Sequence, residues 1–168
     1  FYGPKGQVNQ RQVGLLHCNN DNIVQLDDDI RFDATVMKSL VDEVSKNPDI
    51  IVSPVFYNPN ADHCITGTKV GQSRLLKFLY GANREKEVLG VGYVSAIGLA
   101  IRPSSLKDRD FISSDWLPGG CMAYNKKFST LDSEIVNPEG KFYGEDLINS
   151  HIMKEKGAVL IFMGKLSV

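Results

Sequence analysis

An apolar segment that ends in three consecutive aspartates is the feature of this 168-residue sequence that most restricts its fold. Residues 23–26 (Ile-Val-Gln-Leu) are bounded by turn formers and are typical of a short buried strand. The three aspartates at 27–29 follow directly, and apolar residues at helical spacing then run from Asp33, a good N-cap, to Pro48. Residues 50–55 predict a second buried strand. This order of strand, acidic loop, helix and strand indicates an α/β fold with a mixed, mainly parallel sheet flanked by helices.

Weaker patterns predict the remaining elements. A short helix ending near Cys18 precedes the first strand, and a helix over 146–156 ends at Gly157, where glycine favours a C-terminal stop. Three further elements are expected, namely a short helix at 73–80, a strand with glycine bends at 88–101 and a buried strand at 158–163. Neither a linker nor a repeat interrupts them, so we expect a single domain over residues 1–168, cut at both ends from a longer protein.

The composition is that of a nearly neutral globular chain. Its 19 Lys and Arg against 20 Asp and Glu give a net charge of -1, without the basic footprint of a nucleic-acid-binding protein. A run of about 18 apolar residues, which a membrane-spanning helix needs, is not found in the sequence. The three cysteines, at 18, 64 and 121, form neither a zinc pattern nor a disulfide framework, which favours a reducing compartment.

Asp27, Asp28 and Asp29 are the strongest local signal for chemistry. Adjacent carboxylates repel one another, and a hard divalent cation such as Mg²⁺ or Mn²⁺ relieves the repulsion because it takes oxygen ligands. Asp27 and Asp29 converge if the strand ends in a turn between them. The carboxyl ends of strands in open α/β sheets are also where ligands bind. The alternative interpretation is a solvated acidic turn before a helix.

Glu145 and Asp146 form a second acidic pair, at the start of the later helix. Carboxylates there stabilise a helix through its macrodipole, and this is the structural alternative. The functional interpretation is a general base or a second electrostatic element. The preceding Phe142 and Tyr143 would partly desolvate Asp146 and raise its pKa.

The segment 115–127 places the only tryptophan of the chain, Trp116, close to the paired glycines Gly119 and Gly120. Paired glycines allow a close approach between the backbone and a ligand. An aromatic face is suited to stacking on a sugar. A loop that only packs against the core is the alternative.

These motifs, in this order, resemble those of the inverting glycosyltransferases of family 2, which have the Rossmann-like glycosyltransferase A-type (GT-A) fold. Residues 10–15 (Gln-Arg-Gln-Val-Gly-Leu) resemble the family's ARNxG helix, and residues 26–29 resemble its metal-binding DxD. Residues 115–127 resemble the acceptor-side DWLxGxxMxxRR segment, and residues 144–146 resemble the GED motif that carries the catalytic base. The resemblance covers residues 10–163.

The resemblance implies a metal-dependent enzyme that moves a sugar, with inversion, from a nucleoside-diphosphate sugar to a hydroxyl group. Asp29 would coordinate Mn²⁺ or Mg²⁺, with Asp27 beside the metal or the ribose. Asp146 would be the catalytic base, and Glu145 would help to place the acceptor. The other substrate-binding residues that the resemblance implies are Asp28, Arg11, Trp116, Gly119 and Gly120.

The resemblance also implies which acceptor the enzyme uses and where it works in the cell. The acceptor would be a carbohydrate or a lipid-linked molecule in polysaccharide or glycoconjugate synthesis, and nucleic acid would not be a partner. The strand that reads the nucleotide base would lie before Phe1. A cytoplasmic location follows, with peripheral attachment to a membrane through segments outside this chain.

Two other functions fit parts of the pattern. A non-catalytic or degenerate module of the same fold would bind a carbohydrate or a partner protein, but the intact carboxylate motifs argue against it. A metal-dependent nucleotidyltransferase of similar fold also needs a carboxylate pair for a metal and a diphosphate. It does not call for an acceptor base such as Asp146.

Overall fold

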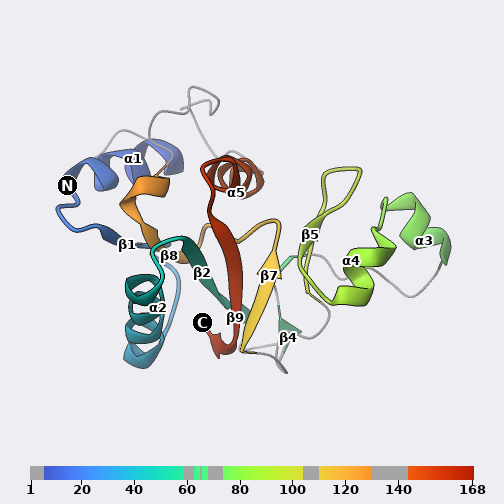
Figure 1. Ribbon diagram of the computed structural model, residues 1–168, viewed down its shortest axis with the longest axis horizontal. Helices are drawn as coiled ribbons and strands as arrows, with labels where there is room; N and C mark the ends of the chain where they lie inside the picture. The colour runs from blue at the N-terminus through green and yellow to red at the C-terminus, as the bar shows by residue number, and fades with distance from the viewer. Residues whose placement is uncertain (1–5, 59–62, 65, 68–73, 104–109, 130–143) are drawn as a thin grey trace.

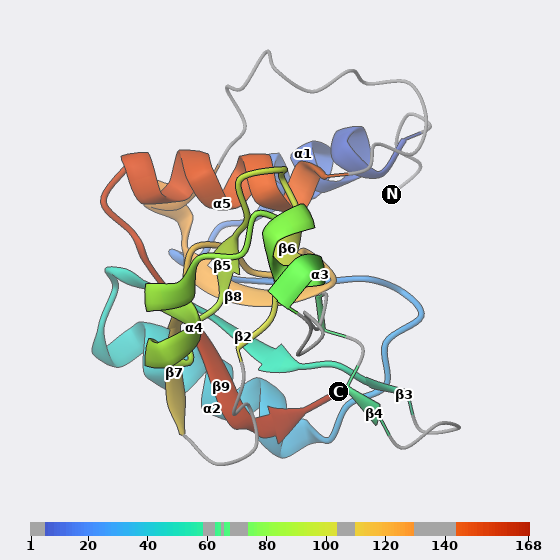
Figure 2. The same ribbon diagram turned by 90° about the vertical axis from the view of Figure 1, so that its right-hand side faces the viewer.

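The computed structural model describes residues 6–58, 63–64, 66–67, 74–103, 110–129 and 144–168. Two views show a central sheet with α1 and α5 on one face and α2 on the other (Figures 1 and 2). In chain order the elements are α1 (Gln7–His17), β1 (Asn22–Leu26), α2 (Ala34–Lys46), β2 (Ile50–Val55), β3 (Tyr57–Asn58), β4 (His63–Cys64), α3 (Arg74–Leu79), α4 (Arg84–Leu89), β5 (Tyr93–Val94), β6 (Ala100–Ile101), β7 (Phe111–Ser114), β8 (Cys121–Asn125), the 3-10 turn η1 (Lys126–Phe128), α5 (Glu145–Glu155) and β9 (Val159–Ser167).

The main sheet has the strand order β1-β8-β2-β9-β7. Strands β1, β2 and β9 run in the same direction, whereas β8 and β7 are antiparallel to their neighbours. The expected mixed α/β sheet with flanking helices is therefore confirmed. Because β8 inserts between β1 and β2, only β2 and β9 form a hydrogen-bonded parallel pair among the described strands.

The α2 side of the sheet is built from the pattern that the sequence predicts. Asp33 caps α2, because its carboxylate accepts a hydrogen bond of 2.8 Å from the Thr35 backbone amide. The buried face of α2 packs on a cluster that includes residues of β2 and β8. This cluster consists of Val36, Leu40, Val44, Ile50, Val52, Cys121, Ala123 and Met163. Every residue of β2 is buried, as expected of a central strand covered on both faces.

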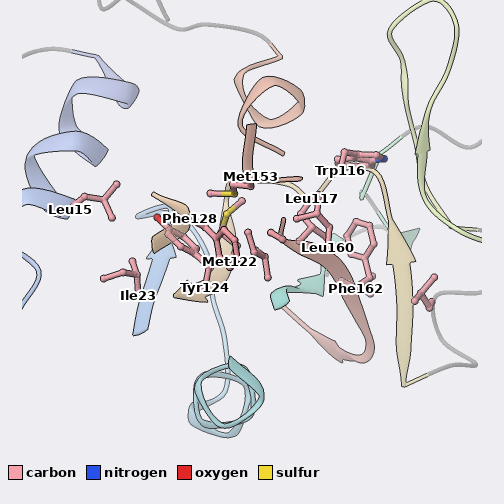
Figure 3. Packing of buried hydrophobic residues seen from close by; sticks show 14 residues of the cluster. Leu15, Ile23, Trp116, Leu117, Met122, Tyr124, Phe128, Met153, Leu160 and Phe162 are labelled. Carbon is pink, nitrogen blue, oxygen red and sulfur yellow. The ribbon is translucent and has the colours of Figure 1, made fainter. Parts of the chain in front are cut away.

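The opposite side of the sheet carries the larger cluster (Figure 3). Leu15 of α1 and Met153 of α5 cover strand residues such as Tyr124, Leu160 and Phe162. These contacts fix both helices to the sheet. They also place α1 and the start of α5 beside the β1–β8 end of the sheet, where the predicted site residues lie.

Two segments differ from the sequence-based expectation. The strand expected over 88–101 is wrong at its start, since α4 extends to Leu89 and ends at Gly90 in the left-handed conformation. Only the short hairpin of β5 and β6 follows. Strand β7 was not expected, because its four residues alternate between exposed and buried positions and contain two serines. Within the described part of the chain, no helix is long and apolar enough to cross a membrane.

Candidate functional site

The acidic loop and the paired glycines meet at one edge of the sheet. Strands β1 and β8 are antiparallel, and Leu26 at the end of β1 pairs with Cys121 at the start of β8. The Asp27 backbone amide donates a hydrogen bond of 2.8 Å to the Gly120 carbonyl. Two motifs that are about ninety residues apart in the sequence therefore become neighbours.

Arg11 connects this edge to α5. Its Nη2 atom lies 2.8 Å from Asp27 Oδ1, and its Nη1 atom lies 3.7 Å from Glu145 Oε1. The Arg11 side chain is only 15% exposed, so its charge is compensated mainly by these carboxylates and not by water. Three predicted site residues from three different elements are thereby brought together around one guanidinium group.

Gly119 lies at the centre of this arrangement. A Cβ atom at this position would lie 2.2 Å from Asp146 Oδ1, closer than atoms in contact can be, and 3.1 Å from Arg11 Nη1, which is a tight contact. Any side chain would therefore displace Asp146. The Gly119 carbonyl accepts a hydrogen bond of 2.7 Å from Gln25 Nε2. Sequence reasoning missed Gln25, although an amide in an otherwise apolar strand is the signal that could have found it.

Asp146 is the residue with the most perturbed acidity in the site. Burial raises its pKa to about 6, and the negative charges of Glu145 and Asp27 act in the same direction. The nearby Gly119 backbone and the charge of Arg11 oppose the rise. Asp146 Oδ1 is buried and accepts no hydrogen bond from the described residues. The expected rise in pKa is confirmed, whereas the aromatic residues 142 and 143 lie outside the described part of the chain.

A cavity of about 700 Å³ opens between α1 and β1. Arg11 and the three aspartates Asp27, Asp28 and Asp29 line it, together with Gln25 and Tyr124. Asp28 and Asp29 are exposed and form a turn directly after β1. Glu145, Asp146 and the two glycines are not among the residues that line this cavity.

The acidic turn fits a hard divalent cation. Its carboxylates are oxygen donors that face one cavity, and Mg²⁺ is commonly held by one or two carboxylates plus substrate phosphates. Among the described residues, no group of three or more His, Cys, Asp or Glu side chains forms a complete cation cage. Asp27 is already paired with Arg11, so Asp29 is the more available ligand.

Trp116 does not take the position that the sequence predicts. It is 4% exposed, and its indole Nε1 donates a hydrogen bond of 3.1 Å to the Ile101 carbonyl. Its ring packs edge-on against Phe162 in the core (Figure 3). The prediction of a sugar platform at Trp116 is therefore wrong, and the packing alternative holds for this residue.

Asp115, the first residue of the same segment, joins two helices. It accepts hydrogen bonds from Lys86 of α4 and, at 2.7 Å, from Lys154 of α5. Burial alone would raise the pKa of Asp115, but the hydrogen bonds and charges of the two lysines outweigh it and lower the pKa. The residue therefore has a structural role beside the site.

Comparison with known proteins supports the fold. No family model and no curated protein matches this sequence. Among solved structures, the chain is similar to a crystal structure of GalNAc-T7 with UDP, GalNAc and Mn²⁺, with a TM-score of 0.61 and 14% sequence identity. The match covers 96% of this chain but only 29% of that one. At this identity the likeness shows the fold alone, which is the GT-A fold of a glycosyltransferase.

Proposed function

We propose that this chain is part of the catalytic domain of a metal-dependent inverting glycosyltransferase, with a nucleoside-diphosphate sugar as donor and a hydroxyl group as acceptor. One observation carries the proposal. Arg11, Asp27, Glu145 and Asp146 converge around Gly119 beside a cavity lined by the acidic turn, in a GT-A fold. A stable fold alone does not require three carboxylates around one arginine.

The donor would occupy the cavity between α1 and β1. Asp29 and Asp27 would hold Mn²⁺ or Mg²⁺, which supplies positive charge to the departing diphosphate when it is bound. Arg11 lines the same cavity and offers a second positive charge to the phosphates. Asp28 would contribute to donor binding from the exposed turn.

Asp146 would act as the base. Its pKa of about 6 leaves the carboxylate ionised at neutral pH while keeping it a better proton acceptor than an ordinary aspartate. Oδ1, which lacks a hydrogen bond from the described residues, would take the proton of the acceptor hydroxyl. The acceptor oxygen forms its bond to C1 as the bond from C1 to the diphosphate oxygen breaks, which inverts the configuration.

The proposal also covers the binding of the acceptor. Glu145 would orient the acceptor by a hydrogen bond, and the absence of a side chain at Gly119 and Gly120 lets Asp146 and Asp27 lie close against this loop. The proposed acceptor is a carbohydrate or a lipid-linked molecule, within polysaccharide or glycoconjugate synthesis. A cytoplasmic location remains part of this proposal.

Donor binding can be tested by calorimetry with Mn²⁺ and a panel of UDP-, GDP- and TDP-sugars. We expect nucleotide-sugar binding that depends on the metal. Asp29→Ala should weaken metal and donor binding together. The matched control is Asp42→Asn, which removes a carboxylate from the exposed surface of α2. Metal-independent binding, or no binding of any donor, would contradict the proposal.

Transfer is tested with the Asp146→Asn variant and a panel of hydroxyl acceptors. The variant should lose transfer while its donor affinity stays nearly unchanged, because the residue acts on the acceptor. In the unmodified chain the rate should rise as the pH passes through about 6, since only the ionised form accepts a proton. Retention of the anomeric configuration in the product, seen by NMR, would exclude the inverting mechanism.

A further inference from the structure

A second surface lies far from the acidic turn, on the unit formed by α3, α4 and the β5–β6 hairpin (residues 74–103). Leu75, Phe78 and Leu79 lie at positions i, i+3 and i+4 of α3 and are all exposed. Phe78 is 83% exposed, and Val88 on α4 is 80% exposed. We call these residues, with Leu89 and Ile97, the apolar patch; Leu89 and Ile97 are also more than half exposed.

Glu87 connects three elements of this unit through polar contacts. Lys77 Nζ of α3 lies 2.6 Å from Glu87 Oε2 of α4. The hydroxyl of Tyr93, which is itself buried, donates a hydrogen bond of 3.4 Å to Glu87 Oε1. Glu87 is thus held by partners from α3 and β5, while the apolar residues of the patch are exposed.

The elements that carry the patch are held together. The Ala96 backbone amide donates a hydrogen bond of 3.2 Å to the Gly81 carbonyl, which follows α3. This contact brings the turn that carries Ile97 to the end of α3. The Lys77–Glu87 ion pair holds α4 beside α3. The unit projects beyond the β7 edge of the sheet, away from α1 (Figures 1 and 2).

The charge of the unit distinguishes it from the rest of the chain. Residues 74–103 contain five Lys and Arg and two Asp and Glu, a net charge of +3, whereas the whole chain carries -1. A protruding apolar patch of leucine, valine and phenylalanine on a basic segment is the composition of an element that lies in a lipid–water interface. The net positive charge of the segment favours anionic over neutral headgroups.

We propose that the unit formed by residues 74–103 docks on the surface of an anionic lipid bilayer through Phe78, Val88 and their apolar neighbours. The apolar side chains enter the interface, and the positive charge of the segment favours anionic over neutral lipid. This inference does not depend on the proposed sugar transfer. It places the attachment within the described residues, whereas the sequence-based expectation assigned it to segments outside the chain.

Vesicle flotation tests the proposal directly. The chain is mixed with vesicles of phosphatidylcholine containing about one third phosphatidylserine, and in parallel with vesicles of phosphatidylcholine alone. We expect flotation with the anionic vesicles and less with the neutral ones, and a loss of binding in about 1 M NaCl as the charges are screened. The double variant Phe78→Ser and Val88→Ser should bind about tenfold more weakly or worse.

The matched control is Leu16→Ser, which removes an exposed leucine from α1 at the other end of the sheet. It should float like the unmodified chain. Equal flotation of the double variant and the unmodified chain would overturn the proposal. It would also be overturned if the unmodified chain fails to float and sedimentation velocity shows a dimer that the double variant loses, because a second copy would then cover the patch.

Fluorescence gives an independent readout. The native Trp116 is buried, so Phe78→Trp adds a single exposed indole. Anionic vesicles should shift the emission of this variant to shorter wavelength, and brominated lipid should quench it. Leu16→Trp should show neither effect. An indole at position 78 that stays in water while the protein floats would show that another surface binds the lipid.

Discussion

The two ends of the sheet differ in the kind of side chain that they hold in an unfavourable environment. At the β1 end, charged side chains lie around the largely buried Arg11, which pairs with Asp27 and Glu145, whereas Asp146 Oδ1 has no hydrogen bond from the described residues. At the β7 end, apolar groups such as Phe78 are exposed while the polar groups pair beside them. Both arrangements reduce stability relative to a fold with charges outside and apolar groups inside.

The comparison contrasts the two proposed functional surfaces. The proposed sugar transfer would use the buried charge of the β1 end, because an ionised base and a positive group in low-dielectric surroundings act strongly on a substrate. The proposed lipid contact would cover the exposed apolar area of the β7 end. We therefore expect the β1 end to be sensitive to the removal of a charge and the β7 end to the removal of apolar surface.

The largest effect is expected for Arg11→Met. The substitution leaves Asp27, Glu145 and Asp146 without the cation that compensates them, and breaking a buried ion pair costs about 3 to 5 kcal/mol. Urea unfolding at pH 7 measures the loss. The control Lys38→Met removes only an exposed ion pair on α2 and should cost less than about 1 kcal/mol. Similar losses for both variants would show that the β1 end has no buried charge network.

Asp146→Asn should instead stabilise the fold at neutral pH. The pKa of Asp146 in the folded protein, about 6, lies above the ordinary value of 3.8, so the folded state binds the proton more tightly. The penalty for the ionised carboxylate is therefore absent below about pH 4 and complete above about pH 6. The variant should gain about 2 to 3 kcal/mol at pH 7, and nothing near pH 4. A gain that is independent of pH would remove burial of the charge as its cause.

The β1 end also shows how much of the structure could be predicted from the sequence. The strand before the aspartates, the Asp33 cap and the helix that starts at Glu145 follow from local patterns, and the structure confirms them. The convergence of β1 with the paired glycines depends on strand order, which no local pattern determines. Gln25 stands out as an amide in an apolar strand, but its hydrogen bond to Gly119 could not be predicted, because the two residues are far apart in the sequence.

The β7 end was predicted less well for physical reasons. Helix α4 is six residues long, and its continuation contains glycines that resemble strand bends. Trp116 was assigned to the cleft because a tryptophan near two glycines suits a ligand, yet the side of the loop that its ring occupies is set by packing on Phe162. The exposure of Phe78 could not be foreseen, since its helical spacing is also that of a core helix.

A smaller loss of stability is expected for Asp115→Asn, which lies between the two ends of the sheet. Asp115 joins α4 to α5 through two lysines, and its pKa is lowered in the folded protein. The stabilisation is present above the ordinary pKa of about 3.8 and is lost as the pH falls through the lower folded value. The variant should lose about 1 kcal/mol at pH 7. The difference from the unmodified chain should shrink below pH 4, and a difference that grows there would contradict the lowered pKa.

The smallest effect on stability is expected for Phe78→Ser. The ring is exposed in the folded chain as it is in the unfolded one, so its removal changes little buried area, and serine and phenylalanine have similar helix propensities. The change in unfolding free energy should be within about 0.5 kcal/mol. Leu40→Ala, a truncation of a fully buried side chain of α2, should cost about 2 to 5 kcal/mol in the same measurement. A large loss at Phe78 would mean that the ring supports the fold, and the contrast between the two ends of the sheet would then fail, because the β7 end would be ordinary core.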